Sequence, residues 1–228
     1  GCDSQGGFVI LWSNESAQEM NMAGSSQKKG TRFFCYRDYL GWPGPDRWEI
    51  IGGEAWAMVP GPDADHQRVL RDLCTQINVF LKGNRCELFQ APFDLLLPTA
   101  AEADEEVQTV LQPDAFVVCE PEKITQRGCR AAPDRIIEVL PPSTASRDQI
   151  LKRRLYEQAH VKEYWIISPA ERLVFVYHLH KNRLALTEIY DDTAKIAVKT
   201  LPGLTVDCAA VFPPAPAKAF KEPPAPYT

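Results

Sequence analysis

The sequence predicts an α/β (α+β) fold in which helices flank a central mixed β-sheet. Three observations indicate this fold: two amphipathic helical stretches, a group of short apolar runs between them, and one further run after the second helix. The runs are rich in β-branched residues and bounded by proline or charged residues, as buried strands are. The expected order of helix, three strands, helix and strand lies at residues 65–82, 87–97, 112–118, 136–140, 147–160 and 163–168.

Size, composition and charge limit the class of protein. The chain has 228 residues, 45% of them apolar, which is enough for one sizeable domain. A net charge of −5 argues against a protein that coats nucleic acid non-specifically. The seven cysteines are odd in number and form no C-x-x-C pair, which favours reduced thiols and a cytoplasmic location. The early apolar run at residues 8–12 is too short to span a bilayer, so no membrane partner is expected.

Three segments are expected along the chain. Residues 1–34 are rich in Gly, Ser, Asn and Gln and show no helical or strand period, which predicts a disordered extension. Residues 35–212 form the expected folded domain. Residues 213–228 are rich in proline and predict an extended tail.

The first part of the domain predicts a short helix and a hairpin. Residues 36–40 could form the helix, and residues 48–58 read as two strands around a Gly-Gly turn. Glu49 and Glu54 are polar surface positions by default, with a position near a functional site as the alternative.

The helix at residues 65–82 follows a loop that contains capping residues and ends before a Gly-Asn pair. Its apolar stripe consists of Val69, Leu70, Leu73, Ile77, Phe80 and Leu81. His66 lies on this stripe and is therefore expected to point inward. A hydrogen-bonded core histidine and a catalytic histidine are both compatible with that position.

The strand at residues 87–97 is expected to begin the central sheet, with Pro92 at an edge or a bulge. Residues 100–106 are acidic and predict a solvated turn without chemistry.

Asp114 and Glu138 each belong to one of the next two predicted strands. If these strands are antiparallel neighbours with the two acids opposed, the same register pairs Ala115 with Ile137 and Phe116 with Ile136. Both carboxylates then share one face of the sheet, with Cβ atoms about 5 Å apart. Such a pair suits a hard cation such as Mg²⁺. The alternative is that Asp114 caps a turn and Glu138 reaches solvent from an edge strand.

The helix at residues 147–160 carries a buried stripe and a neighbouring polar stripe. The buried stripe is Leu151, Leu155 and Ala159, and the neighbouring one is Asp148, Lys152 and Tyr156. Lys152 is therefore expected over the end of the sheet, and an intrahelical pair with Asp148 is the alternative. A basic approach surface for a polyanion is expected from Arg147, Arg153, Arg154 and Lys162.

Peripheral strands are expected after the core, at residues 173–179, 184–190 and 194–198. His178 and His180 alternate on one strand face, but no third metal ligand lies nearby in the sequence.

Eight segments between residues 35 and 179 carry a family resemblance: RWEIIGGE at 47–54, DHQR at 65–68, APFD at 91–94, QPD at 112–114, APD at 132–134, EVLPPST at 138–144, KRRLYE at 152–157 and EYW at 163–165. Together, and in this order, they resemble the Uma2 family of restriction-endonuclease-like proteins in the PD-(D/E)XK nuclease superfamily. The resemblance implies a restriction-endonuclease-like core with an N-terminal hairpin and extra C-terminal strands.

The same resemblance assigns site residues. It makes Asp114 and Glu138 the metal-binding acids. Leu140 stands where the superfamily has its usual lysine, and in this family the lysine looks to have moved to the following helix, which fits Lys152. The residues that match other family positions near the pocket are His66, Glu54 and Tyr156. Two departures, Pro141 for a small polar residue and Ser168 for an acid, affect the pocket rim and remove no proposed ligand.

These observations predict a Mg²⁺- or Mn²⁺-dependent endonuclease, a phosphodiesterase acting on DNA. Asp114, Glu138 and the backbone carbonyl of Val139 are expected to hold the metal, and Lys152 to orient water or stabilise developing charge. DNA is the expected partner, and a homodimer is left open. The alternative is a catalytically inactive protein of the same fold that binds nucleic acid or another protein. An enzyme acting on another kind of substrate is a third option.

Overall fold

The computed structural model describes residues 33–44, 47–58, 62–140 and 146–214. The predicted extension and the predicted proline-rich tail therefore lie outside the described residues, apart from residues 33–34 and 213–214.

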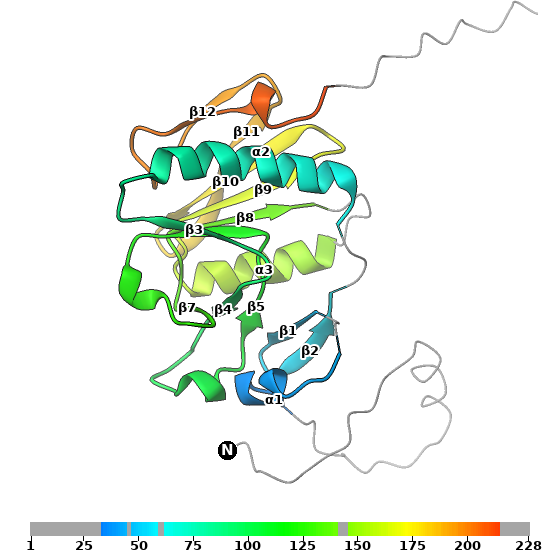
Figure 1. Cartoon of the computed structure of the whole chain (residues 1–228), viewed down its shortest axis with the longest axis vertical. Helices are drawn as coiled ribbons and strands as arrows, with labels where there is room; N and C mark the ends of the chain where they lie inside the picture. Colours follow the sequence, from blue (N-terminus) through cyan, green and yellow to red (C-terminus); the bar gives the residue numbers. More distant parts are fainter. Residues whose placement is uncertain (1–32, 45–46, 59–61, 141–145, 215–228) are drawn as a thin grey trace, which may run out of the picture.

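A six-stranded sheet forms the middle layer of the main body (Figure 1). Helix α2, Ala64–Leu81, covers one face of this sheet, and helix α3, Ser146–Gln158, covers the other. A second sheet of five strands lies beyond α3 together with the short predicted helix α1, Tyr36–Leu40. Buried side chains fill the space on both faces of the six-stranded sheet and within the second lobe.

The six-stranded sheet has the order β11–β10–β9–β8–β6–β3, and only β8 and β9 are parallel neighbours. Its strands are β3 Glu87–Gln90, β6 Ala115–Val118, β8 Arg135–Val139, β9 Glu163–Ser168, β10 Leu173–His180 and β11 Arg183–Asp191. The predicted order of helix, three strands, helix and strand is thus confirmed by α2, β3, β6, β8, α3 and β9. The predicted register is also confirmed, because β6 and β8 are antiparallel and pair Ala115 with Ile137 and Phe116 with Ile136.

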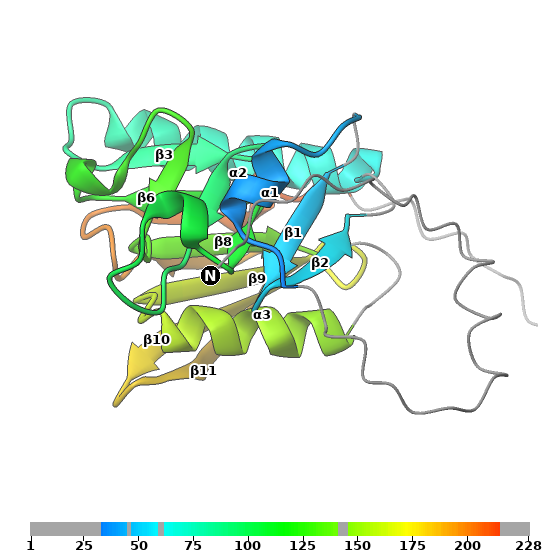
Figure 2. The same ribbon diagram turned by 90° about the horizontal axis from the view of Figure 1, so that it is seen from below.

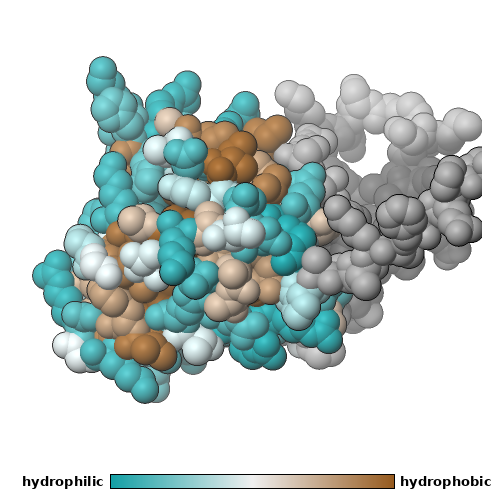
Figure 3. Space-filling model, turned by 90° about the horizontal axis from the view of Figure 1, so that it is seen from above, coloured by the Kyte–Doolittle hydropathy of each residue, from teal (hydrophilic) through white to brown (hydrophobic). Residues whose placement is uncertain are grey.

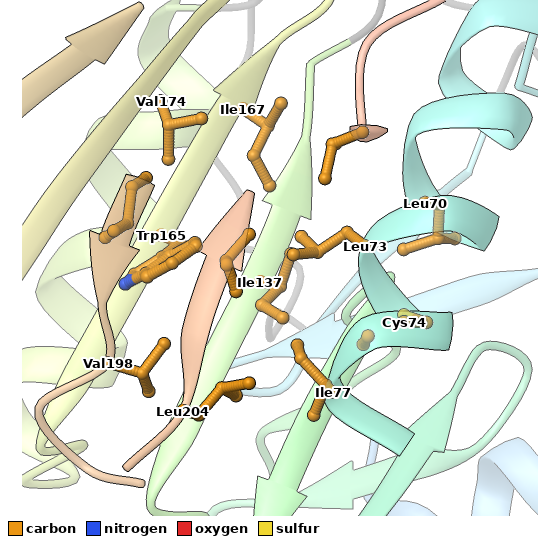
Figure 4. Close-up of a cluster of buried hydrophobic side chains, with 14 of the residues drawn as sticks. Leu70, Leu73, Cys74, Ile77, Ile137, Trp165, Ile167, Val174, Val198 and Leu204 are labelled. Atoms are coloured by element: carbon orange, nitrogen blue, oxygen red, sulfur yellow. The ribbon is translucent and has the colours of Figure 1, made fainter. Parts of the chain in front are cut away.

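Alternation along β8 explains why this strand is buried on both faces. Ile137 packs in the core that includes Leu73 and Ile77 of α2 (Figure 4). Ile136 points to the opposite face and joins the core that includes Tyr156 of α3. Successive side chains of a strand alternate between faces, so Glu138 belongs to the α3 side.

The run at residues 87–97 does not form one strand, contrary to the prediction. Residues 87–90 form β3 at the edge of the six-stranded sheet, whereas Asp94–Leu96 form β4 in the second sheet. Pro92 lies between them and has no N–H to donate to a ladder, so it marks the point where the chain leaves one sheet for the other. The single central sheet of the prediction is therefore corrected to two mixed sheets.

The second sheet has the order β2–β1–β5–β4–β7. The predicted hairpin forms one side of it, and Gly52 and Gly53 both adopt positive φ in its turn. Figure 2 shows this hairpin beside α1 in the view from below. Two very short strands of this sheet were not predicted. The remaining strands are β1 Trp48–Ile51, β2 Glu54–Ala57, β5 Val110–Leu111 and β7 Gly128–Arg130.

A small C-terminal hairpin closes the core on the α2 side. It pairs β12, Lys195–Ala197, with β13, Thr205–Asp207. Val198 and Leu204 of this region lie beside Trp165 and Ile137 in the core (Figure 4). On the face seen from above, hydrophilic side chains are interleaved with smaller hydrophobic areas (Figure 3).

Cys86 and Cys119 form a disulfide at the end of the β3–β6 ladder. The expectation that all thiols are reduced is therefore corrected for this pair. The free cysteines that the structure describes are all buried: Cys35, Cys74, Cys129 and Cys208. No helix within the described ranges has both the length and the apolar character that a membrane span requires.

Candidate active site

Asp114 is fixed at the point where the chain enters β6. Its Oδ2 atom accepts a hydrogen bond of 2.7 Å from the backbone N–H of Val139, the last residue of β8. This bond ties the acid to the neighbouring strand, beside Glu138. The alternative in which Asp114 merely caps a local turn is therefore wrong.

Glu138 turns its carboxylate toward α3 and is almost enclosed, with 13% of its side chain exposed. The hydroxyl of Tyr156 donates to its Oε1 atom at 2.7 Å, and the ammonium of Lys152 lies 3.4 Å from the same oxygen. Lys152 and Tyr156 are one helical turn apart, so α3 presents both groups to one carboxylate. The edge-strand alternative for Glu138 is wrong, because β8 lies between β6 and β9.

Lys152 also contacts Glu49, for which a surface position was expected by default and a position near a functional site was the alternative; the default is wrong, because Glu49 is buried. The Nζ atom of Lys152 lies 3.0 Å from Oε1 of Glu49, and the two side chains are only 9% and 6% exposed. Glu49 belongs to β1 of the second sheet. The sequence signal that could have revealed it is its position inside the apolar strand, where it interrupts Trp48 and Ile50.

His66 completes the cluster from the first turn of α2. Its Nε2 atom lies 3.3 Å from Oδ1 of Asp114, and its side chain is 7% exposed. Asp63 caps the helix by accepting a hydrogen bond of 2.8 Å from the His66 backbone N–H. Burial alone would lower the pKa of His66, but the contact with Asp114 and nearby negative charge outweigh it, so its pKa is raised above 6.5.

Burial and neighbouring negative groups both raise the pKa of Glu138. Burial raises the pKa of Glu138 to about 7, and the charges of Asp114 and Glu49 add to this increase. The charge of Lys152 and the hydrogen bond from Tyr156 act in the opposite direction. Burial beside Glu138 likewise raises the pKa of the Tyr156 hydroxyl, which therefore remains a hydrogen-bond donor. A cation near these acids would favour the ionised form of Glu138.

The structure brings together five of the six side chains predicted for the site: Asp114, Glu138, Lys152, His66 and Tyr156. The sixth, Glu54, is exposed on β2 and, within the described part of the chain, does not join this cluster. The intrahelical alternative for Lys152 does not describe its position, since its ammonium faces Glu49 and Glu138.

The carboxylate oxygens of Asp114 and Glu138 are ligands of the type that a hard divalent ion prefers. Among the described residues, no three His, Cys, Asp or Glu side chains converge as a ready-made metal site. Mg²⁺ usually takes only one or two carboxylates and completes its shell with water and phosphate oxygens. Asp114 and Glu138 supply such oxygens from adjacent strands. The residues present are therefore compatible with Mg²⁺ or Mn²⁺.

The predicted basic approach surface is only partly assembled. Arg154 is exposed on α3, and Arg153 lies over the ring of Tyr177. Lys162 instead pairs with Asp134 at 2.6 Å, at the opposite end of β8 from Glu138. The side chain of Arg147 lies outside the described residues.

A polar groove of about 430 Å³ runs along α2 and reaches Gln90 of β3. Its polar lining residues are Gln67, Arg68, Arg71, Thr75, Asn78 and Gln90. Gln67 follows His66 in the chain, and Gln90 pairs with Ala115, the residue after Asp114. These two lining residues of the groove are thus chain or strand neighbours of His66 and Asp114, and the described lining includes none of the five clustered side chains.

Comparisons with known proteins identify the family and the fold of the chain. The chain matches the Uma2 family model, described as "Putative restriction endonuclease", over residues 36–210. The "Uncharacterized protein slr1290" of Synechocystis sp. (strain ATCC 27184 / PCC 6803 / Kazusa) is 25% identical over 169 residues, 72% of this chain and 84% of that protein. A solved structure, a "putative nuclease belonging to DUF820 from Anabaena variabilis ATCC 29413", is similar with a TM-score of 0.62 and 20% identity, over 78% of this chain and 97% of that chain. At this identity the structural likeness supports the fold alone.

Proposed function

The chain belongs to the Uma2 family, and from this premise we propose that it is a divalent-metal-dependent nuclease that hydrolyses phosphodiester bonds in DNA. The order α2, β3, β6, β8, α3 and β9 would then be its restriction-endonuclease-like core. The observation that carries the proposal is the convergence of Asp114, Glu138 and Lys152, which come from three different elements.

Asp114 and Glu138, with the backbone carbonyl of Val139, are the proposed ligands for Mg²⁺ or Mn²⁺. When bound, such an ion lowers the pKa of a coordinated water and offsets charge on the attacked phosphate. Lys152 carries a compact positive charge that can orient the water or stabilise charge developing on the phosphate.

The remaining side chains hold these groups in place. Tyr156 donates to Glu138 and so fixes the orientation of its carboxylate. His66 lies against the other acid, Asp114, and is itself held by the capped end of α2. Hydrogen bonds and contacts to a metal-binding carboxylate restrict its orientation and so favour one geometry of the site.

The groove along α2 supports DNA as the substrate. Arg68 pairs there with the exposed Asp65, and Arg71 pairs with the partly exposed Asp72. Surface ion pairs of this kind contribute little to stability. Phosphate groups of a DNA backbone can therefore replace the two carboxylates as partners of the guanidinium groups. Amide side chains of glutamine and asparagine add hydrogen bonds of the type that DNA-binding proteins make to phosphates and bases.

Incubation of supercoiled plasmid with purified protein tests the proposal. The wild type should cut with Mg²⁺ or Mn²⁺ and stop when a chelator is added. Asp114→Asn, Glu138→Gln and Lys152→Ala should each lower the rate by about 100-fold or more, as the loss of a transition-state contact does. Glu105→Gln is the matched control, because Glu105 is an exposed glutamate on the 3₁₀ turn Asp104–Glu106.

Calorimetric titration with Mg²⁺ separates the proposal from an inactive binding protein. The wild type should bind the ion, and Asp114→Asn should not. Cutting that is equal in all variants, or wild type that neither binds Mg²⁺ nor cuts, would refute the nuclease.

A further inference from the structure

Glu49 is the closer of the two carboxylates around Lys152. The ammonium lies 3.0 Å from Glu49 and 3.4 Å from Glu138. A lysine side chain has several rotatable bonds and loses much rotamer freedom when it is held in one place. A buried ammonium is stable only beside groups of opposite charge. The position of Nζ in the site therefore depends on where Glu49 is.

Glu49 is itself held firmly. Its Oε1 atom accepts a hydrogen bond of 3.0 Å from the backbone N–H of Gln112, and the whole residue is 4% exposed. Gln112 lies directly after β5 and only two residues before Asp114. The segment around Gln112 therefore holds Glu49 in place and also leads directly to Asp114, the proposed metal ligand.

A buried network continues behind Gln112. The Gln112 amide donates at 2.8 Å to Asp94, and its oxygen accepts at 2.8 Å from the guanidinium of Arg47. Asp94 in turn accepts hydrogen bonds from the hydroxyls of Tyr36 and Tyr39. Connected buried hydrogen bonds of this kind select one arrangement of the side chains involved.

We propose that Glu49 is the positioning residue for Lys152: the second sheet supplies a fixed carboxylate that holds the ammonium at the place where the reaction uses it. The inference rests on the proposed nuclease function and adds a role that no comparison assigns. Glu49 acts through Lys152 and needs no contact with substrate or metal. Its carboxylate shares the charge contact of Lys152 with Glu138.

Two variants of Glu49 and one control separate this role from a general loss of structure. Glu49→Gln keeps the size of the side chain and an oxygen for the Gln112 N–H, but removes the negative charge. Glu49→Ala removes both. Glu105→Gln makes the same chemical change as Glu49→Gln at an exposed position in the same lobe.

The first measurement does not depend on activity. The amine of Lys152 is labelled with acetic anhydride, and the rate is followed by mass spectrometry of the peptide that contains it. A lysine that has lost its fixed partner should be labelled several-fold faster in Glu49→Gln and faster still in Glu49→Ala, with no change in Glu105→Gln. Equal labelling rates in wild type and Glu49→Gln would overturn the proposal. Should Glu49→Ala fail to fold, the isosteric glutamine variant decides.

The second measurement uses DNA cleavage. Glu49→Gln should lower kcat by about tenfold or more, the scale of a misplaced catalytic group, and leave KM for DNA and Mg²⁺ affinity near the wild-type values. In a Lys152→Ala background, Glu49→Gln should cause no further loss, because it acts through the lysine. Additive losses would refute the positioning role. If the wild type does not cut DNA at all, the proposed function fails, and the labelling result still decides the role of Glu49.

Discussion

Several buried charged side chains of this protein lie beside a group of opposite charge. Outside the candidate site, the clearest case is Arg135, which is fully buried, pairs with Glu163 and lies 4.3 Å from the ring of Trp165. Glu163 also accepts hydrogen bonds from Thr200 and Trp165. Burial would raise the pKa of Glu163, but Arg135 and these donors outweigh it, so its pKa lies below 4.5.

We predict that Glu163→Gln lowers the free energy of unfolding at pH 7 by about 3 kcal/mol or more, because Arg135 remains buried without its counter-charge. The pH dependence follows from the lowered pKa: the stabilisation is complete above the unfolded value of 4.5 and is lost as pH falls through the folded value. Urea unfolding between pH 7 and pH 3 measures both effects. The variant should show a shallower loss of stability below pH 5 than the Glu105→Gln control, and parallel curves would contradict the prediction.

The residues of the candidate site show how far sequence reasoning reaches. Asp114, Glu138 and Lys152 were predictable because strand register and helical period place neighbours of known spacing. For Glu49 the sequence left a surface position and a position near the site both open, because its contact with Lys152 depends on how the second sheet packs against α3. No local pattern encodes that packing, whereas a charged residue between apolar neighbours gives only a weak indication of it.

Among the elements, α2 connects the core to the candidate site. Its buried side packs on the six-stranded sheet through residues such as Leu73 and Ile77, and its first turn carries His66. Asp63 accepts the His66 N–H and thereby fixes where the helix begins. The start of α2 therefore sets the position of His66 relative to Asp114.

We predict that Asp63→Ala lowers the free energy of unfolding by about 1 kcal/mol, the usual effect of losing a helix cap. Asp65→Ala is the matched control, because Asp65 forms an exposed ion pair with Arg68. Loss of this pair should lower the free energy of unfolding by less than loss of the cap. Chemical denaturation followed by circular dichroism measures both variants. A larger effect for Asp65→Ala than for Asp63→Ala would show that the cap does not hold the helix.

The elements that escaped prediction are short or interrupted. β5 and β7 have two and three residues, too few to show a strand period. Residues 87–97 have the composition of one strand, and only Pro92 indicates a break. The predicted helices and the longer strands were found near their expected positions because their patterns extend over several residues.

At the scale of the whole molecule, a covalent link joins strands that lie far apart in sequence. Cys86 and Cys119 are 33 residues apart and bridge the ends of β3 and β6. Cysteine number and spacing could not predict this pair, because an odd count with no spacing motif fits many pairings. Between the two cysteines the chain leaves the six-stranded sheet after β3, forms β4 and β5 of the second sheet, and returns to form β6. The disulfide closes this loop.

We predict that reduction of this disulfide lowers the free energy of unfolding by about 4 kcal/mol, as expected for a closed loop of this length. Thermal and urea unfolding with and without dithiothreitol measure the effect. The double variant Cys86→Ser, Cys119→Ser should be less stable than oxidised wild type and insensitive to the reductant. A wild type that is equally insensitive would show that the bond does not form in solution.

The contact of Lys152 with both sheets has a consequence for synthesis. Glu49 leaves the ribosome about a hundred residues before Lys152, and β9, the parallel neighbour of β8, follows later still. When only the first half of the chain has left the ribosome, Glu49 is present but Lys152, its ion-pair partner, has not yet been made. The charged cluster can thus be assembled only after translation has passed Lys152, the last of its charged groups to be made.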